Sequence, residues 1–369
     1  MERKVIMQTA SDVDTMDEEL RSHLQDLAYG DFQNRWVSLK KLVKWGDMAI
    51  QPLLELLQDE ALDWEVHWFA ARGLSEFDRP EVIDALLQML ISAEEEVLQA
   101  AAAEALSQIG APAIAALSGQ LHHRQHHALA ALALTRIYHP TAIPHLLELT
   151  ADPNANIREQ AVNALSPFCS PEIEPHLIRA LTDPAAAVRI AAIKGLSRHH
   201  QQLDTLTLNR FQACLKDENN QVAAAAMAAL SRVSSSQVVN IISGVLTDAA
   251  ASQSRRAMAA RTLGWIESPA ALRALIKAWD HSNLELRLAI INALGNQPAA
   301  LASQATQALL VWLPQLQNAP EAEKLLQELA LALGRLRDDR AADILEELSH
   351  HQHPGVRLHS QAGRRQLTS

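Results

Sequence analysis

A leucine recurs every 28 to 34 residues along most of this chain, and this regularity constrains the fold more than any other feature. Each of these leucines lies near the end of a short apolar segment such as VRIAAIKGLS or LRLAIINALG. A fixed period of roughly 20–50 residues is typical of architectures in which small structural repeats stack on one another. The shared leucines are Leu74, Leu106, Leu134, Leu165, Leu196, Leu230, Leu263 and Leu294.

Each unit of the repeat holds two apolar segments with the periodicity of helices. The segments EIEPHLIRALTD and VRIAAIKGLS, for example, have apolar residues at i, i+3, i+4 and i+7. One pair of short helices cannot bury its apolar face, but stacked pairs can bury theirs against each other. The sequence therefore predicts an all-α fold, an α-solenoid (superhelix) of about ten stacked two-helix repeats of ~31 residues each.

The link between units carries an aspartate followed by an arginine. The aspartate can cap the next helix by accepting from its free N–H groups. It can also pair with the arginine, either on that helix or on a neighbouring repeat. The pairs are Asp152 and Arg158, Asp183 and Arg189, Asp248 and Arg255, and Asp280 and Arg287.

These segments and the aspartate–arginine pairs resemble the HEAT repeat, with its patterns D-x-x-x-x-x-R and V-R-x-x-A-x-x-A-L-G. The length of the unit is similar to that of the phycobilisome-lyase subgroup of HEAT-like repeats, which is common in cyanobacteria. The resemblance covers roughly residues 34–367. It implies one solenoid over residues 21–369, and we expect an acidic lead-in over residues 1–20. It is specific to the fold, because one repeat architecture serves many unrelated tasks.

Composition narrows the classes of function. The net charge is −11, and an acidic chain without a basic stripe is a poor binder of nucleic acid. No run approaches the ~20 apolar residues of a membrane span. Two cysteines in 369 residues fit a reducing compartment. We therefore expect a soluble cytoplasmic protein with neither nucleic acid nor a membrane span.

An aromatic and basic stripe lies in the segment DWEVHWFAARGLSEF. Trp64, Trp68 and Arg72 are four residues apart, so a helix places them on one face. Equivalent positions in other copies hold small or polar residues, so the packing of the repeat does not require them. Exposed tryptophan beside arginine is typical of binding hot spots. With the neighbouring Trp36 and His67, the stripe is our candidate surface for a partner or ligand.

A second interpretation of this stripe stays open. Terminal repeats of an array are atypical, because they have to cover the apolar face of the last internal unit. The acidic N-terminal helix can fold over Trp64 and Trp68 as such a cap. The alternatives are therefore a binding surface and a covered end of the array.

The segment HHRQHH is a candidate metal site. On a helix, His122 shares one face with His126, and His123 with His127, which is a plausible spacing for metal ligands. Cys169, in a predicted turn, is the other candidate ligand. No carboxylate or cysteine lies near the histidines in the sequence, and the segment falls in the shortest repeat. We interpret it as a solvated turn between helices and expect no metal.

Motifs for catalysis are absent from the sequence. It has no phosphate-binding G-x-x-x-x-G-K-[ST] loop, no G-x-S-x-G elbow and no His-Glu dipeptide of the kind that binds iron in deoxyhypusine hydroxylase. We expect a non-enzymatic scaffold or adaptor that holds another protein on the concave face lined by the second helices. The family resemblance implies partners among phycobiliproteins or iron–sulfur assembly proteins.

The alternative hypothesis is a bilin lyase, or a bilin-binding chaperone, that acts on phycobiliproteins. Lyases of the E/F type use such repeats, and their substrate is a linear tetrapyrrole with two propionates. Trp64, Trp68 and Arg72 would form its cradle through stacking and charge-assisted hydrogen bonds. Phycocyanobilin is then the expected bound ligand, and no other cofactor is expected.

Overall fold

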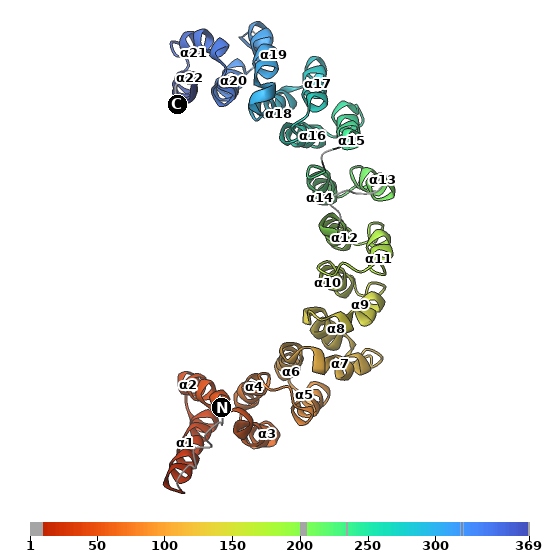
Figure 1. The fold of residues 1–369 in the computed structure, drawn as a ribbon, viewed down its shortest axis with the longest axis vertical. Helices are drawn as coiled ribbons and strands as arrows, with labels where there is room; N and C mark the ends of the chain where they lie inside the picture. Colours follow the sequence, from red (N-terminus) through yellow and green to blue (C-terminus); the bar gives the residue numbers. More distant parts are fainter. Residues whose placement is uncertain (1–9, 200–204, 234, 318, 320, 368–369) are drawn as a thin grey trace, which may run out of the picture. The chain divides into compact units, whose positions relative to one another are not determined.

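The computed structural model describes residues 10–199, 205–233, 235–317, 319 and 321–367. Within these residues every regular element is an α-helix or a short 3₁₀ helix, and the helices follow one another in pairs (Figure 1). The prediction of an all-α repeat fold is therefore confirmed. None of the described helices is long and apolar enough to cross a bilayer.

The chain forms two compact units, residues 1–176 and 177–369. In the first unit, helix α1 begins inside the predicted acidic lead-in, and residues 1–9 of that lead-in lie outside the described part. The elements of the first unit are α1 (Ala10–Tyr29), α2 (Phe32–Leu42), η1 (Val43–Ala49), α3 (Ile50–Gln58), α4 (Trp64–Leu74), α5 (Pro80–Ser92), α6 (Glu96–Ile109), η2 (Ala111–Ala113), α7 (Ile114–Gln120), α8 (His127–Arg136), η3 (Pro140–Ala142), α9 (Ile143–Leu149) and α10 (Ala155–Leu165).

Helix α11 (Glu174–Ala180) contains the boundary between the units. The elements that follow are α12 (Ala186–His199), α13 (Thr205–Cys214), α14 (Asn220–Leu230), α15 (Ser236–Thr247), α16 (Gln253–Trp265), α17 (Pro269–Ala278), η4 (Trp279–His281), α18 (Leu284–Gly295), α19 (Ala299–Gln317), α20 (Ala322–Leu336), η5 (Asp339–Ala341), α21 (Ala342–Leu348) and α22 (Pro354–Leu367).

The second helices of successive pairs stack side by side within each unit. In the first unit α4 packs on α6, α6 on α8 and α8 on α10, while α3 and α5 lie in a parallel row of first helices (Figure 1). In the second unit the row of second helices runs from α12 to α22. Within each unit these second helices are thus in contact with the second helices of the neighbouring repeats.

The leucines that define the repeat form the centre of this packing. All eight of them, from Leu74 to Leu294, have 0% of their surface exposed. In helix α4 the predicted core residues Val66, Phe69 and Ala70 are buried as well. The period read from the sequence is therefore the period of the hydrophobic core.

Polar side chains at the starts of the helices fix where several of them begin. The hydroxyl of Ser235 accepts from the N–H of Val238, and Ser252 accepts in the same way from Arg255. Asn283 caps α18 by accepting from Leu286. Such caps supply acceptors to the first N–H groups of a helix, which have no partner inside it.

The second helices of the second unit approach one another closely at glycine and alanine. A Cβ added at Gly264 of α16 would lie 2.7 Å from both the Cα and the Cβ of Ala293 in α18. A Cβ at Gly334 of α20 would lie 2.4 Å from the Cα of Gly363 in α22. The glycine that follows the shared leucine in these repeats is therefore required by the contact between backbones.

Replacement of Gly264 by alanine should destabilise the second unit. Alanine gains up to about 1 kcal/mol in helix propensity, but forcing a methyl group against the neighbouring backbone costs about 1–3 kcal/mol. We expect a net loss of about 1 kcal/mol or more in the free energy of unfolding, measured by urea denaturation.

The matched control is Gly244→Ala in α15, the partner helix of α16. A Cβ at Gly244 meets nothing within 4 Å. This substitution should leave the free energy of unfolding unchanged or raise it by up to about 1 kcal/mol. Equal stability of the two variants would contradict a close contact at Gly264.

Candidate functional site

Most of the second helices carry, near the first turn, a side chain that donates a hydrogen bond to a main-chain carbonyl of the preceding turn or, for Arg256, of the end of the preceding helix. We call these side chains turn donors. In Arg189, for example, Nη1 lies 2.7 Å from the carbonyl oxygen of Asp183, six residues earlier. The turn donors are His67, Gln99, His127, Arg158, Arg189, Arg256 and Arg357.

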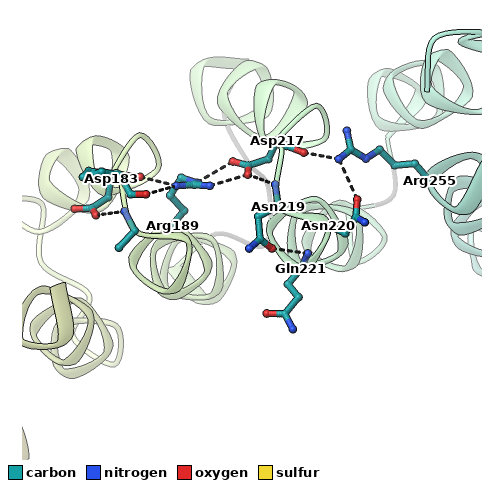
Figure 2. A network of polar contacts seen from close by, with 9 residues as sticks. Asp183, Arg189, Asp217, Asn219, Asn220, Gln221 and Arg255 are labelled. Atoms are coloured by element: carbon teal, nitrogen blue, oxygen red, sulfur yellow. Dashed lines mark hydrogen bonds and ion pairs between the residues drawn. The ribbon is translucent and has the colours of Figure 1, made fainter. Parts of the chain in front are cut away.

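Arg189 also links its turn to the next repeat. Its Nε and Nη2 donate to the two carboxylate oxygens of Asp217, at 2.8 and 2.7 Å (Figure 2). The carboxylate accepts in addition from the N–H of Asn219, and Arg255 of α16 donates to the main-chain oxygen of Asp217. The prediction that an arginine pairs with the aspartate of a neighbouring repeat is confirmed at this position.

The charges of this pair stabilise each other. The hydrogen bond with Asp217, assisted by the carboxylate's charge, raises the pKa of Arg189. Burial acts to raise the pKa of Asp217, but the hydrogen bonds from Arg189 and Asn219 outweigh it, and the pKa of Asp217 is lowered. Both groups therefore stay charged, and their ion pair links the two turns.

His127 takes the place of the arginine in the shortest repeat. Its Nδ1 lies 2.7 Å from the carbonyl oxygen of Leu121, again six residues earlier. Its Nε2 lies 2.5 Å from Oδ2 of Asp152 in the next repeat. Burial acts to lower the pKa of His127, but the hydrogen bonds to Leu121 and Asp152 raise it overall. The imidazolium thus performs both tasks of Arg189.

The other candidate metal ligands lie apart from this contact. Helix α8 begins at His127, so His122, His123 and His126 lie in the turn before it, in agreement with our interpretation of the segment as a turn, and they do not have the helical spacing considered for a metal site. Cys169 is exposed and free. No three histidine, cysteine, aspartate or glutamate side chains in the described part of the chain are arranged to hold a metal ion.

The contact of His127 with Asp152 should make the stability of the first unit depend on pH. Because the pKa of His127 is raised in the folded state, its contribution is complete below the ordinary histidine value near 6.5. The contribution is lost as the pH rises through the higher folded value. Between about pH 6 and pH 8.5 we expect a loss of order 1 kcal/mol in the free energy of unfolding, measured by urea denaturation.

The variant His127→Arg tests this assignment. Arginine keeps its charge over the whole range, so the part of the pH dependence that His127 contributes should disappear. The control is His122→Arg, which adds the same charge at an exposed position of the same turn. A wild-type pH dependence in His127→Arg would show that this histidine does not carry the effect.

The predicted tryptophan stripe of α4 is divided between two environments. The Trp68 ring is half-buried and lies 6.2 Å from the ring of Trp36 in α2, and both rings contact the buried Phe69. Arg35 of α2 and Glu65 of α4 form an ion pair at 2.6 Å beside them. Helix α2 therefore covers part of the stripe, whereas the second interpretation of the sequence assigned this role to the acidic N-terminal helix.

The remaining residues of the predicted site point in other directions. Trp64 is 47% exposed. Nε2 of His67 lies 2.9 Å from the carbonyl oxygen of Asp59, so this histidine is a turn donor. The guanidinium of Arg72 donates to Gln108 of α6. Trp64 is therefore the member of the stripe that offers most free surface, and Arg72 has a partner in the next repeat.

Trp64 and His67 line a groove of about 670 Å³ between the repeats α3–α4 and α5–α6. We call it the Trp64 groove. Its apolar lining comes from Leu57, Leu62, Met89 and Leu98, with Trp64 on one wall. Exposed carboxylates of the two turns stand around it, and they are Glu60, Glu94 and Glu95.

The search for sites in the sequence missed the turn donors and this groove. The aspartate–arginine spacing revealed only the units with both residues. Aligning the units on the residue that begins each second helix would have placed His67 and Gln99 at the position of Arg189, because they occupy the same point of the first turn. The groove itself depends on the separation of two turns, which no local pattern encodes.

Comparison with known families identifies the repeat. The chain matches the family described as HEAT repeats over residues 20–107, 50–127, 120–197, 174–257 and 207–295. Residues 325–351 match the family described as PBS lyase HEAT-like repeat. Among curated proteins, no sequence matches this chain.

Solved structures of yeast importin-β share the fold. In its complex with Nup1, Kap95 has a TM-score of 0.68 and 16% identity, over 95% of this chain and 56% of that chain. The Kap95p structure that concerns RanGDP has a TM-score of 0.65 and 16% identity, over 95% of this chain and 55% of that chain. A structure of yeast importin-β (Kap95p) has a TM-score of 0.53 and 13% identity, over 95% of this chain and 57% of that chain. This chain thus spans about half the length of the structures it resembles, and the likeness is one of fold.

Proposed function

Because this chain belongs to the HEAT-repeat proteins, we propose that it is a non-enzymatic scaffold that binds another protein along its row of second helices. The observation that carries the proposal is Trp64, which is 47% exposed at the start of a second helix although the buried core of its repeat is complete without it. Nearby, Phe32 of α2 is 60% exposed. Large exposed aromatic side chains are the residues on which protein interfaces concentrate their binding energy.

A stacked repeat suits this task because each added pair of helices extends the surface without a new fold. Two of the similar solved structures concern Kap95 with other proteins, Nup1 in one and RanGDP in the other. The PBS lyase HEAT-like match at residues 325–351 supports a narrower proposal. In that proposal the partner belongs to the assembly of a cofactor-containing protein, either photosynthetic or iron–sulfur, in the cytoplasm.

Affinity capture from a lysate of the source organism tests the scaffold. We expect the wild-type protein to retain a defined partner, which is then purified and titrated against it. Trp64→Ala should weaken binding by about tenfold or more, since truncation of a hot-spot residue costs about 2 kcal/mol. Failure to retain any protein at several salt concentrations would overturn the proposal.

The matched control is Trp265→Ala at the end of α16. Trp265 is 71% exposed and belongs to the second unit. If the first repeats form the contact, this variant should bind the purified partner with wild-type affinity. Equal weakening by the two substitutions would show that the effect of Trp64→Ala is not specific to the α2–α4 region.

Bilin binding is the second candidate, and the aromatic rings of Trp64 and Trp68 favour it. In this proposal they stack on phycocyanobilin, while Arg72 turns from Gln108 to a propionate. Purified protein mixed with phycocyanobilin should then shift the pigment's absorption spectrum, and Trp68→Ala should reduce the shift. An unchanged spectrum with the wild-type protein would exclude the pigment.

A further inference from the structure

The Trp64 groove carries negative charge that the described part of the chain does not neutralise. Glu60, Glu94 and Glu95 stand at its two turns, and none of them forms an ion pair with a described residue. All three are exposed, while the lining around Leu57, Met89 and Leu98 is apolar. The groove thus combines an apolar lining, an open tryptophan ring and an excess of carboxylates.

The second unit contains an equivalent groove of about 660 Å³, and there the chain supplies a cation. That groove lies between α11–α12 and α13–α14, and Arg189 and Asp217 line it. The Arg189 guanidinium spans the two turns, because it donates to the carbonyl of Asp183 and to the carboxylate of Asp217 (Figure 2). Between these repeats the anionic turns are therefore joined by an arginine.

The positions correspond residue by residue. Each groove is bounded by a turn donor, Arg189 in one and His67 in the other. The turn that follows holds Asp217 and Glu218 in the second unit, and Ala93 and Glu94 in the first. In the Trp64 groove Ala93 thus stands in place of Asp217, Glu94 matches Glu218, and the shorter His67 stands in place of Arg189.

We propose that the Trp64 groove binds an arginine side chain of a basic segment in the partner protein. The guanidinium lies between the two turns, as the guanidinium of Arg189 does in the second unit. It stacks on the indole of Trp64 and pairs with Glu94 and Glu95, and the aliphatic part of the side chain lies against Met89 and Leu98. The inference rests on the proposed scaffold function and names the chemistry of the partner.

Arginine suits these contacts better than lysine. Its planar guanidinium can lie on an aromatic face and still donate in the plane to a carboxylate. An ammonium group is a compact and strongly hydrated charge, so it loses more on entering a partly apolar groove. The opposite charges of groove and ligand also speed the encounter and make binding weaken with added salt.

Titration with a short labelled peptide tests the proposal. The probe is fluorescein-Ala-Arg-Ala-Arg-Ala-amide, followed by anisotropy at low and at physiological salt. Trp64→Ala and the double variant Glu94→Gln/Glu95→Gln should each weaken binding by about three- to tenfold. A peptide with citrulline in place of arginine keeps the shape without the charge, and it should bind more weakly by a similar factor.

Two substitutions in the second unit control for unspecific effects. Glu267→Gln/Glu285→Gln removes two exposed charges elsewhere, and Trp265→Ala removes an exposed indole. Both should bind the arginine peptide as the wild type does. Unchanged thermal melting of all variants by circular dichroism shows that they are folded. The proposal would be overturned if Glu94→Gln/Glu95→Gln bound the arginine peptide as tightly as the wild type does. It would also be overturned if the wild type bound the citrulline peptide as tightly as the arginine peptide.

The outcome for the groove can be separated from the outcome for the scaffold. If Glu94→Gln/Glu95→Gln binds the purified partner with wild-type affinity while Trp64→Ala does not, the scaffold stands and the arginine site falls. If no partner is captured although the peptide binds as expected, the scaffold falls and the groove remains an arginine site.

Discussion

In the described part of the chain, most second helices follow a turn whose carbonyl groups accept a hydrogen bond from a turn donor. Carbonyl groups at the end of a helix have no partner within it and cost free energy when they are shielded from water, so a donor at the turn stabilises a stack of short helices. The turn donors meet this need from the first turn of the next helix, and they also fix the distance between the two helices of a pair. Where the donor is Arg189 it reaches the following repeat too, so one side chain sets both the turn and the spacing between repeats. Packing of the leucines and closure of the turns are therefore coupled.

The identity of the donor decides the character of each junction. Arginine gives a permanent charge that neutralises an aspartate, as in the pair of Arg189 and Asp217. Histidine at position 127 makes the same two contacts, but its charge depends on pH. At position 67 the ring reaches only its own turn, and the acidic groups of the next turn stay open to solvent. A regular fold can thus carry different chemical surfaces at equivalent places.

The repeat and its core could be predicted from sequence because both depend on local periodicity. Each shared leucine recurs with a helical pattern, and burial follows from that pattern. The roles of individual polar residues could not be predicted in this way. His127 meets Asp152 only because two turns 25 residues apart are stacked, and Arg72 meets Gln108 across 36 residues. The tryptophan stripe of α4 could be predicted because the core of the repeat does not require its side chains. Which part of the stripe Trp36 covers could not be predicted, because it depends on how α2 packs against α4.

The close approach at Gly264 and Gly334 has a consequence for how the chain folds. In a linear array each repeat is stabilised mainly by its neighbours, so structure grows outward from the junctions with the strongest coupling. A backbone that lies directly on a backbone makes many short contacts at one crossing, with no flexible side chains between them to order. The row from α16 to α22 is thus a favourable place for the first stable nucleus to form. A ribosome releases these helices after those of the first unit, so the first repeats leave it before this nucleus can form.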